Sequence, residues 1–258
     1  MGKIISIANQ KGGVGKTTTS VNISACLALA GKKVLLIDAD PQGNATSGVG
    51  GKKDVEKSTY DLIVHQEEIK NVIQSSAVKN LDLCASNINL AGAEVELVSQ
   101  ISRETKLKEV LEPAKADYDF IIIDCPPSLG LVTLNALTAS DSVLVPIQCE
   151  YYALEGLGQL MSTIDLVQKH LNKKLDIEGV VLTMYDARTN LSRQVIEEVK
   201  KYFKNKVYKT IIPRNVKLSE APSFGLPIAL YDKNSKGAIA YTDLAKEVIK
   251  NNSKKVKA

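Results

Sequence analysis

Residues 11–18, Lys-Gly-Gly-Val-Gly-Lys-Thr-Thr, combine three glycines with two lysines and two threonines. Glycines let backbone N–H groups turn inward around an anion without a Cβ atom in the way, and the positive end of a following helix adds to the attraction. In such a loop Lys16 reaches the β and γ phosphates of a nucleotide, and the Thr17 hydroxyl binds Mg²⁺. The segment therefore predicts a nucleoside triphosphate site. Its candidate binding residues are Lys11, Gly12, Gly13, Val14, Gly15, Lys16, Thr17 and Thr18.

The residues on both sides of this loop occur in the order that phosphate binding requires. Residues 4–8 are apolar and predict a buried parallel strand. Residues 17–30 carry apolar side chains at near-helical spacing and stop before Gly31, which predicts a helix with a glycine at its C-terminal end. The alternative, a flexible surface turn, does not explain a lysine and two threonines directly after the glycines.

Two further apolar runs end in carboxylates. Residues 34–37 are followed by Asp38 and Asp40, and residues 120–123 are followed by Asp124. Ligands of an open α/β sheet bind outside the carboxyl ends of its strands, which predicts Asp40 near the γ phosphate and Asp124 near Mg²⁺. Since Mg²⁺ keeps several of its waters, Asp124, and also Asp40, would bind it through water. Each carboxylate could instead be a solvated strand end or a helix N-cap, and for Asp38 this alternative is favoured.

The order of strand and helix patterns predicts a single doubly wound α/β domain, with a mostly parallel sheet and helices on both faces. A chain of 258 residues with 44% hydrophobic content can bury one large core. No linker and no internal repeat divides it, so residues 1–258 are expected to form one domain, with residues 251–258 as a flexible basic tail. Further strands are expected at residues 81–85, 143–146, 180–184 and 207–212. Helices are expected at residues 92–112, 129–139, 154–171, 192–204 and 235–250.

Other features of the sequence limit the possible classes of protein. Residues 48–57 are the most irregular stretch and are expected at the surface. The sequence has neither a signal peptide nor an apolar run of membrane-spanning length, which predicts a cytoplasmic location. The four cysteines lack C-x-x-C spacing, so buried reduced thiols are favoured over disulfides or a zinc site. They are Cys26, Cys84, Cys125 and Cys149.

The net charge of +4 is unevenly distributed along the chain. Residues 1–168 hold 14 Lys or Arg against 20 Asp or Glu, whereas residues 169–258 hold 19 against 9. A basic C-terminal third predicts a polyanionic partner, either nucleic acid or an acidic membrane face. Since there is no helix-turn-helix pattern or zinc-finger spacing, and few aromatic residues for base stacking, double-stranded DNA held by its phosphates without sequence specificity is favoured.

The loop departs from the common phosphate-loop pattern in having Gln10 in place of a glycine and Lys11 inside the loop. This form resembles that of the P-loop NTPases with a deviant Walker A motif, and within them the ParA/Soj family of chromosome-partitioning proteins. The resemblance extends from about residue 2 to about residue 250, and it identifies the family better than any one member. Four further segments are similar to the family in the expected order: residues 34–45 (VLLIDADPQGNA), 121–127 (IIIDCPP), 148–155 (QCEYYALE) and 212–222 (IPRNVKLSEAP).

The resemblance implies a weak ATPase that uses ATP and Mg²⁺. It assigns the orientation of the attacking water to Asp40. It assigns stabilisation of phosphate charge to Lys16 and Lys11, where Lys11 acts in its own subunit or reaches the nucleotide of a second copy. It also places Gly12 at the face of a dimer that sandwiches the nucleotides, where a side chain would separate the two copies.

The same resemblance places Pro213 and Asn215 beside the adenine, and makes the loop after Asp124, which Pro126 and Pro127 stiffen, a switch that responds to the γ phosphate. It assigns non-specific DNA binding to Arg188 and Lys217, although the family often has an arginine at the second position; the alternative for both is an ordinary solvated cation. It implies a ParB-type centromere-binding protein that stimulates hydrolysis, a role in bacterial chromosome or plasmid segregation, and association with the nucleoid.

Two other classes of ATPase stay open. A MinD-like membrane-associated positioning ATPase shares the loop motifs but needs a C-terminal amphipathic helix with a bulky apolar face, whereas residues 250–258 are Lys-Asn-Asn-Ser-Lys-Lys-Val-Lys-Ala. A metal-cluster carrier related to the nitrogenase iron protein needs cysteines that bridge two subunits, and no cysteine lies in a matching motif. The favoured function is therefore an ATP-driven dimer whose combined basic faces bind DNA.

Overall fold

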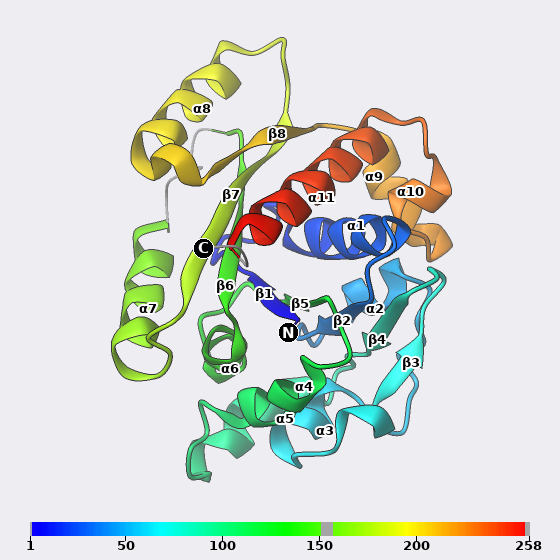
Figure 1. Ribbon diagram of the computed structural model, residues 1–258, viewed down its shortest axis with the longest axis vertical. Coiled ribbons are helices and arrows are strands. Elements are labelled where there is room, and N and C mark those ends of the chain that lie inside the picture. The colour runs from blue at the N-terminus through cyan, green and yellow to red at the C-terminus, as the bar shows by residue number, and fades with distance from the viewer. Residues whose placement is uncertain (1, 151–156, 256–258) are drawn as a thin grey trace.

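The apolar runs of the sequence form the central strands of a single sheet (Figure 1). The computed structural model describes residues 2–150 and 157–255, which form eight strands in the order β3-β4-β2-β5-β1-β6-β7-β8. Neighbouring strands are parallel except β3 and β4, which are antiparallel, so the predicted doubly wound, mostly parallel sheet is confirmed. The strands are β1 (Lys3–Ile7), β2 (Val34–Asp38), β3 (Ile73–Ser75), β4 (Leu81–Cys84), β5 (Phe120–Asp124), β6 (Ser142–Gln148), β7 (Asp176–Tyr185) and β8 (Val207–Pro213).

Helices cover both faces of the sheet, because successive side chains of a strand point to opposite faces and both faces carry apolar residues. The helices are α1 (Lys16–Leu29), α2 (Asn44–Gly48), α3 (Thr59–Val64), α4 (Leu90–Glu96), α5 (Lys106–Ala114), α6 (Leu131–Ala139), α7 (Leu157–His170), α8 (Asn190–Phe203), α9 (Val216–Glu220), α10 (Ile228–Tyr231) and α11 (Lys236–Lys255). Short 3₁₀ helices are η1 (Ile69–Asn71), η2 (Leu97–Ser99), η3 (Lys204–Lys206) and η4 (Ala221–Phe224). Buried side chains of α1, α2 and α9–α11 form one core cluster with one face, and those of α3–α8 form a second cluster with the other (Figure 1).

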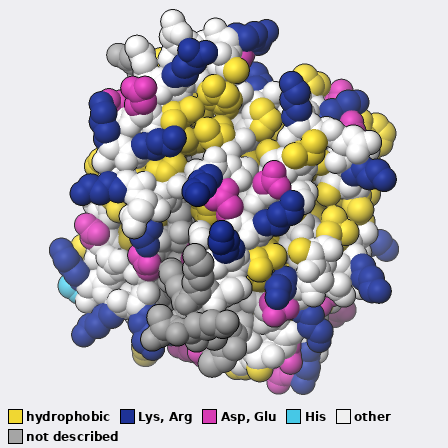
Figure 2. Space-filling view, turned by 45° about the horizontal axis from the view of Figure 1, so that its top comes forward, with side chains coloured by type: hydrophobic (Ala, Val, Ile, Leu, Met, Phe, Trp, Pro, Cys, Tyr) yellow, Lys and Arg dark blue, Asp and Glu magenta, His cyan; other side chains and the backbone are white. Residues whose placement is uncertain are grey.

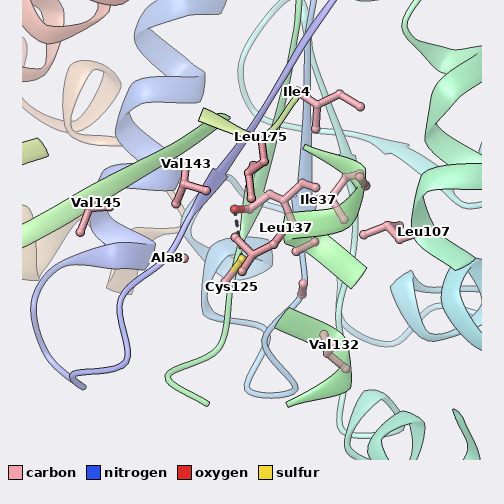
Figure 3. Close-up of a cluster of buried hydrophobic side chains, with 14 of the residues drawn as sticks. Ile4, Ala8, Ile37, Leu107, Cys125, Val132, Leu137, Val143, Val145 and Leu175 are labelled. Atoms are coloured by element: carbon pink, nitrogen blue, oxygen red, sulfur yellow. Dashed lines mark hydrogen bonds between the residues drawn. The ribbon is translucent and has the colours of Figure 1, made fainter. Parts of the chain in front are cut away.

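The second cluster extends to the loop that follows β5 (Figure 3). Ile4 and Ile37 from the sheet and Leu137 of α6 pack in this cluster together with Cys125, the first residue of that loop. All four cysteines are buried and free, as predicted. Burial raises the pKa of the Cys125 thiol to about 12, which keeps it protonated and unreactive near neutral pH.

The predicted helix at residues 92–112 is wrong, because α4, η2 and α5 occupy this stretch as separate elements. The chain between η2 and α5 turns at Ser102, which has a left-handed φ of +55°. Arg103 stabilises the turn: its guanidinium donates to the carbonyl oxygen of Val98 at 2.8 Å, and its own carbonyl accepts from the Asn135 side chain at 2.7 Å. Asn135 belongs to α6, so a partner distant in sequence interrupts the helix.

Other elements differ at their ends from the predicted bounds. Within the described residues α7 begins at Leu157, and its apolar stripe is buried as core, as predicted. Residues 148–155, one of the segments that resemble the family, lie partly outside the described residues. Helix α11 continues past residue 250 to Lys255, into the segment expected as a flexible tail, and residues 256–258 lie outside the described residues. The pattern does not predict the edge strand β3, since three residues show no periodicity.

The stretch expected to be irregular, residues 48–57, is largely exposed between residues 50 and 57 and joins α2 to α3. In the part of the chain that the structure describes, none of the helices is sufficiently long and apolar to span a bilayer.

The predicted site residues lie at one edge of the sheet. The segments that carry them follow the carboxyl ends of β1, β2, β5, β7 and β8.

Candidate nucleotide-binding site

The glycine-rich loop connects β1 to α1 at the carboxyl edge of the sheet. Gly13 and Gly15 have φ angles of +74° and +89°, which residues with a Cβ atom rarely adopt. Gly15 is also the N-cap of α1, and the first turn of the helix has neither a capping side chain nor an acidic residue. The N–H groups of that turn are therefore available to an anion, which the positive end of the helix also attracts.

Lys16, the first residue of α1, is buried against this loop. Only 7% of it is exposed, and its Nζ donates to the carbonyl oxygen of Lys11 at 3.0 Å. Burial lowers the pKa of the Lys16 ammonium, while the negative charges of Asp124 and Asp40 oppose that shift. The N–H of Lys11 donates to Asn9, whose side chain in turn donates to the carbonyl of Pro146, so the loop is tied to β6.

Asp38, the last residue of β2, fastens the segment that follows it. It has no exposed surface, and its Oδ2 accepts from both the N–H and the hydroxyl of Thr46 at 2.7 Å. Its Oδ1 accepts from the N–H of Asp40 at 3.1 Å, and the Thr46 hydroxyl accepts from the N–H of Ser86. Asp38 is thus not a solvated strand end; it accepts from the N–H of the third residue of α2 and holds the loop that carries Asp40.

Asp40 lies further out, at the partly exposed rim of the site. Its Oδ1 accepts from the N–H of Gln42 at 2.9 Å, and its carbonyl accepts from the N–H of Gly43. Its charge affects the pKa values of Asp124 and Lys16, so these three groups share one electrostatic environment. The structure therefore brings Asp40 to the edge of the phosphate loop, with its other carboxylate oxygen directed to no described donor.

Asp124, the last residue of β5, is completely buried next to Asp38 in the strand register. The Ser20 hydroxyl donates to its Oδ1 at 2.7 Å, whereas its Oδ2 is buried without a hydrogen-bond partner among the described residues. Burial raises the pKa of Asp124, the charge of Asp38 raises it further, and the hydrogen bond from Ser20 opposes the shift.

These residues fit a magnesium ion that is held mainly by water and phosphate oxygens. The unpartnered oxygen of Asp124 and the neighbouring Thr17 hydroxyl offer oxygen donors of the kind that Mg²⁺ prefers. No group of three His, Cys, Asp or Glu side chains within residues 2–150 and 157–255 is arranged to hold a metal alone. A site of this type requires the phosphates of the nucleotide to complete it.

Pro213 and Asn215 line a cavity of about 270 Å³ beside the phosphate loop. The cavity is also lined by Gly15 and by Thr183 and Met184 of β7. The Asn215 side-chain oxygen accepts from the N–H of Lys217 and caps α9, so its amide nitrogen remains to donate to a base. Only the resemblance pointed to Pro213 and Asn215, and sequence reasoning missed Thr183, whose hydroxyl donates to the carbonyl of Val14 at 2.8 Å.

The two residues predicted to bind DNA follow neighbouring strands. Arg188 follows β7 and its side chain is 86% exposed, with a two-pronged ion pair to Asp186 at 2.6 and 2.9 Å. Lys217 lies in α9 after β8 and pairs with Glu220 at 3.1 Å. Between them is Arg214, which the sequence reasoning missed; its N–H donates to the carbonyl of Tyr185 and joins the two strand ends.

The chain is similar over nearly its whole length to proteins of known family. Residues 2–177 match a family described as an AAA domain. The chain is 68% identical to the sporulation initiation inhibitor protein Soj of Bacillus subtilis, over 97% of this chain and 100% of that protein. It is 54% identical to the chromosome partitioning protein ParA of Myxococcus xanthus, over 99% and 90%. A solved structure of cobyrinic acid a,c-diamide synthase from Mycobacterium smegmatis, with bound ADP and magnesium, is 38% identical with a TM-score of 0.86, over 98% of this chain and 96% of that one.

Replacing Lys16 by alanine should abolish tight nucleotide binding, because it removes the buried ammonium that faces the phosphates. A hydrogen bond to a charged group contributes up to about 3 kcal/mol, so the affinity for ATP should fall about a hundredfold or more. Isothermal titration calorimetry with Mg·ATP measures this, with Lys32→Ala as a control that removes a lysine outside the loop. Equal ATP affinity in Lys16→Ala and Lys32→Ala would refute the assignment.

The raised pKa of Asp124 predicts how stability depends on pH. Between about pH 4, where an ordinary Asp titrates, and the raised pKa, the folded state retains a proton that the unfolded chain has lost. The free energy of unfolding of the nucleotide-free protein should therefore decrease as the pH rises through this window, and Asp124→Asn should reduce that slope. Urea unfolding at several pH values tests this, with the exposed Asp54→Asn as the control; an unaltered slope in Asp124→Asn would contradict it.

Proposed function

The chain belongs to the ParA/Soj family of chromosome-partitioning ATPases, and we propose that it works as a switch in which ATP joins two copies and the dimer holds DNA. It is an ATPase whose substrate is ATP and whose cofactor is Mg²⁺. The dimer, the DNA and the partner that triggers hydrolysis are the parts that we propose.

We assign the chemistry of hydrolysis to the carboxyl edge of β2 and β5. Asp40 has one carboxylate oxygen engaged by Gln42, and its second oxygen would orient the attacking water and accept its proton. Lys16 and Lys11 would stabilise the negative charge on the phosphates. Thr17 and Asp124 would hold Mg²⁺, which neutralises phosphate charge when bound.

Gly12 carries the proposal of a dimer. It is exposed, its φ is not left-handed, and a Cβ atom built on it would meet no atom within 4 Å. Neither backbone strain nor crowding inside one copy therefore requires glycine here, and a close approach from outside the copy explains it better. A second copy facing this loop across the nucleotides would approach in this way, with Lys11 of one copy near the phosphates of the other.

The basic C-terminal third supports DNA as the polyanion. Figure 2 shows Lys and Arg side chains spread over one face of the molecule, with apolar side chains exposed among them. Arg188, Lys217 and Arg214 are exposed or half-exposed, and each is paired with a carboxylate. Exposed ion pairs are worth about 0–1 kcal/mol, so DNA phosphates can replace these carboxylates at small cost. Two copies double the phosphate contacts, and DNA binding then depends on the nucleotide.

A ParB-type centromere-binding protein would complete the cycle by stimulating hydrolysis and releasing the dimer from DNA. This partner follows from the family, whose members include proteins named for chromosome partitioning. The corresponding process is segregation of a bacterial chromosome or plasmid, with the ATP-bound dimer on the nucleoid. Measuring ATP turnover with such a partner and DNA, together and separately, tests this step, and a rate that neither raises would remove the partner from the proposal.

Asp40→Ala should retain ATP and accumulate as a dimer on DNA. Loss of a general base typically slows a reaction about 10²–10⁴-fold, while the phosphate loop remains intact. Light scattering with Mg·ATP and a phosphate-release assay measure the two effects. The matched control is Gly12→Val, which should bind ATP as a monomer. Normal hydrolysis by Asp40→Ala would refute the assignment of Asp40, and a monomeric Asp40→Ala with Mg·ATP would refute the dimer.

Arg188→Glu should lose DNA binding while dimerisation with ATP is unaffected, because Arg188 lies between β7 and α8 and is not part of the phosphate loop that carries Gly12. Two phosphate contacts are lost per dimer, so the slope of log affinity against log salt should become shallower by about 2. Fluorescence anisotropy with duplex DNA at several salt concentrations measures this. Lys173→Glu is the control, since it makes the same change to a basic exposed residue at the amino edge of the sheet. Unchanged DNA affinity in Arg188→Glu would place the DNA-binding surface elsewhere.

A further inference from the structure

The loop between β5 and α6 begins directly after Asp124, and its middle is tied to α6 by the Thr133 hydroxyl, which donates to the carbonyl of Ser128 at 2.6 Å. Pro126 and Pro127 have no N–H to donate. At its start, the N–H of Cys125 donates to the carbonyl of Ile7 at 3.2 Å. At its end, Gly130 is the N-cap of α6 but has no side chain with which to cap the helix. The position of the loop therefore depends on what holds that end.

Glu94 of α4 supplies the cap that Gly130 lacks. Its Oε2 accepts from the N–H of Leu131 at 2.8 Å, and its Oε1 accepts from the N–H of Val132 at 3.2 Å. The carboxylate also faces the positive end of α6. A Cβ atom on Gly130 would lie 2.5 Å from the Oε1 of Glu94, so the contact requires glycine at this position. Two residues that are distant in sequence thus form one close junction.

We propose that Glu94 is a positioning residue for ATP hydrolysis. By holding the N-terminus of α6, Glu94 sets the position of the loop after Asp124. The loop in turn sets the geometry around the Asp124 carboxylate, which would face the metal and the attacking water. The inference rests on the placement of Asp124 at the Mg²⁺ site in the proposed function. Because the catalytic geometry tolerates little displacement, loss of the junction should slow hydrolysis more than it weakens nucleotide binding.

Glu94→Ala should lower the single-turnover rate of ATP hydrolysis about tenfold and raise the Mg²⁺ concentration needed for half-maximal rate. Its affinity for ADP without Mg²⁺ should stay within about twofold of the unmodified chain, because the phosphate loop is not altered. The hydrolysis rate of Glu94→Gln, which keeps one acceptor oxygen, should lie between that of Glu94→Ala and that of the unmodified chain. Amide hydrogen exchange provides a readout that does not depend on activity: the N–H groups of Leu131 and Val132 should exchange faster in both variants.

Gly130→Ala tests the same junction from its other side and leaves the Glu94 carboxylate in the chain. Its methyl group should displace that carboxylate and reproduce the slower rate. When Gly130→Ala is combined with Glu94→Ala, the hydrolysis rate should fall little further, because both substitutions remove the same contact. These variants also keep the proposal testable if Glu94→Ala does not fold.

Glu247 of α11 offers a matched control. Its carboxylate accepts from the N–H groups of Lys209 and Thr210 at 3.0 and 2.8 Å, the same type of contact on β8. Glu247→Gln should reduce stability in urea without changing the hydrolysis rate. Glu94→Gln and Glu247→Gln are therefore compared at equal loss of stability. If their hydrolysis rates are then both unchanged or equally reduced, Glu94 is only a structural cap and the proposal is overturned. Asp124→Asn, measured in parallel, separates the magnesium site from the positioning role of Glu94. An unchanged Mg²⁺ dependence of hydrolysis in Asp124→Asn refutes the magnesium site, while the rates of the Glu94 variants still decide the role of Glu94.

Discussion

Two buried carboxylates at the ends of neighbouring strands determine most of the site. Asp38 and Asp124 lie in register on β2 and β5, and neither has exposed surface. Burial raises the pKa of both, and the charge of Asp38 also raises that of Asp124. Asp38 is satisfied by donors of the chain itself, principally Thr46, whereas Asp124 keeps one oxygen without a donor in the described structure. A buried carboxyl group with one unpartnered oxygen, next to the ammonium of Lys16, makes this edge suitable for a cation and a phosphate chain together, because a bound cation would favour the ionised carboxylate.

The same edge also relates the nucleotide to the proposed DNA contacts. Thr183, near the end of β7, lines the cavity beside the phosphate loop, and Arg188 follows a few residues later. In the same way Asn215 after β8 lines that cavity, and its side chain caps the helix that carries Lys217. Each candidate DNA contact is therefore only a few residues along the chain from a residue that lines this cavity. A nucleotide that orders these two segments would order the cations beyond them.

Local patterns predicted the parts of the molecule that depend on local geometry. The glycines of the phosphate loop, the apolar strands that end in Asp38 and Asp124, and the buried stripe of α7 all follow from the allowed backbone angles or from periodicity. The expected helix at residues 92–112 was wrong because Asn135 and Arg103 stabilise a turn within it. Periodicity records which side chains are apolar; it carries no information about a hydrogen-bond partner on another element.

What the sequence alone determined was the class of the protein: a doubly wound α/β ATPase with a deviant phosphate loop, a carboxylate after each of two central strands, and a basic C-terminal third. Only the tertiary structure decided that Asp38 holds the Asp40 loop through Thr46, that Asp124 has an unpartnered oxygen, and that Glu94 caps α6 at Gly130. The physical reason is that the first set depends on backbone conformation and solvent transfer, which each segment expresses by itself. The second depends on the placement of donors and acceptors within about 3 Å of each other, which exists only after distant segments have packed.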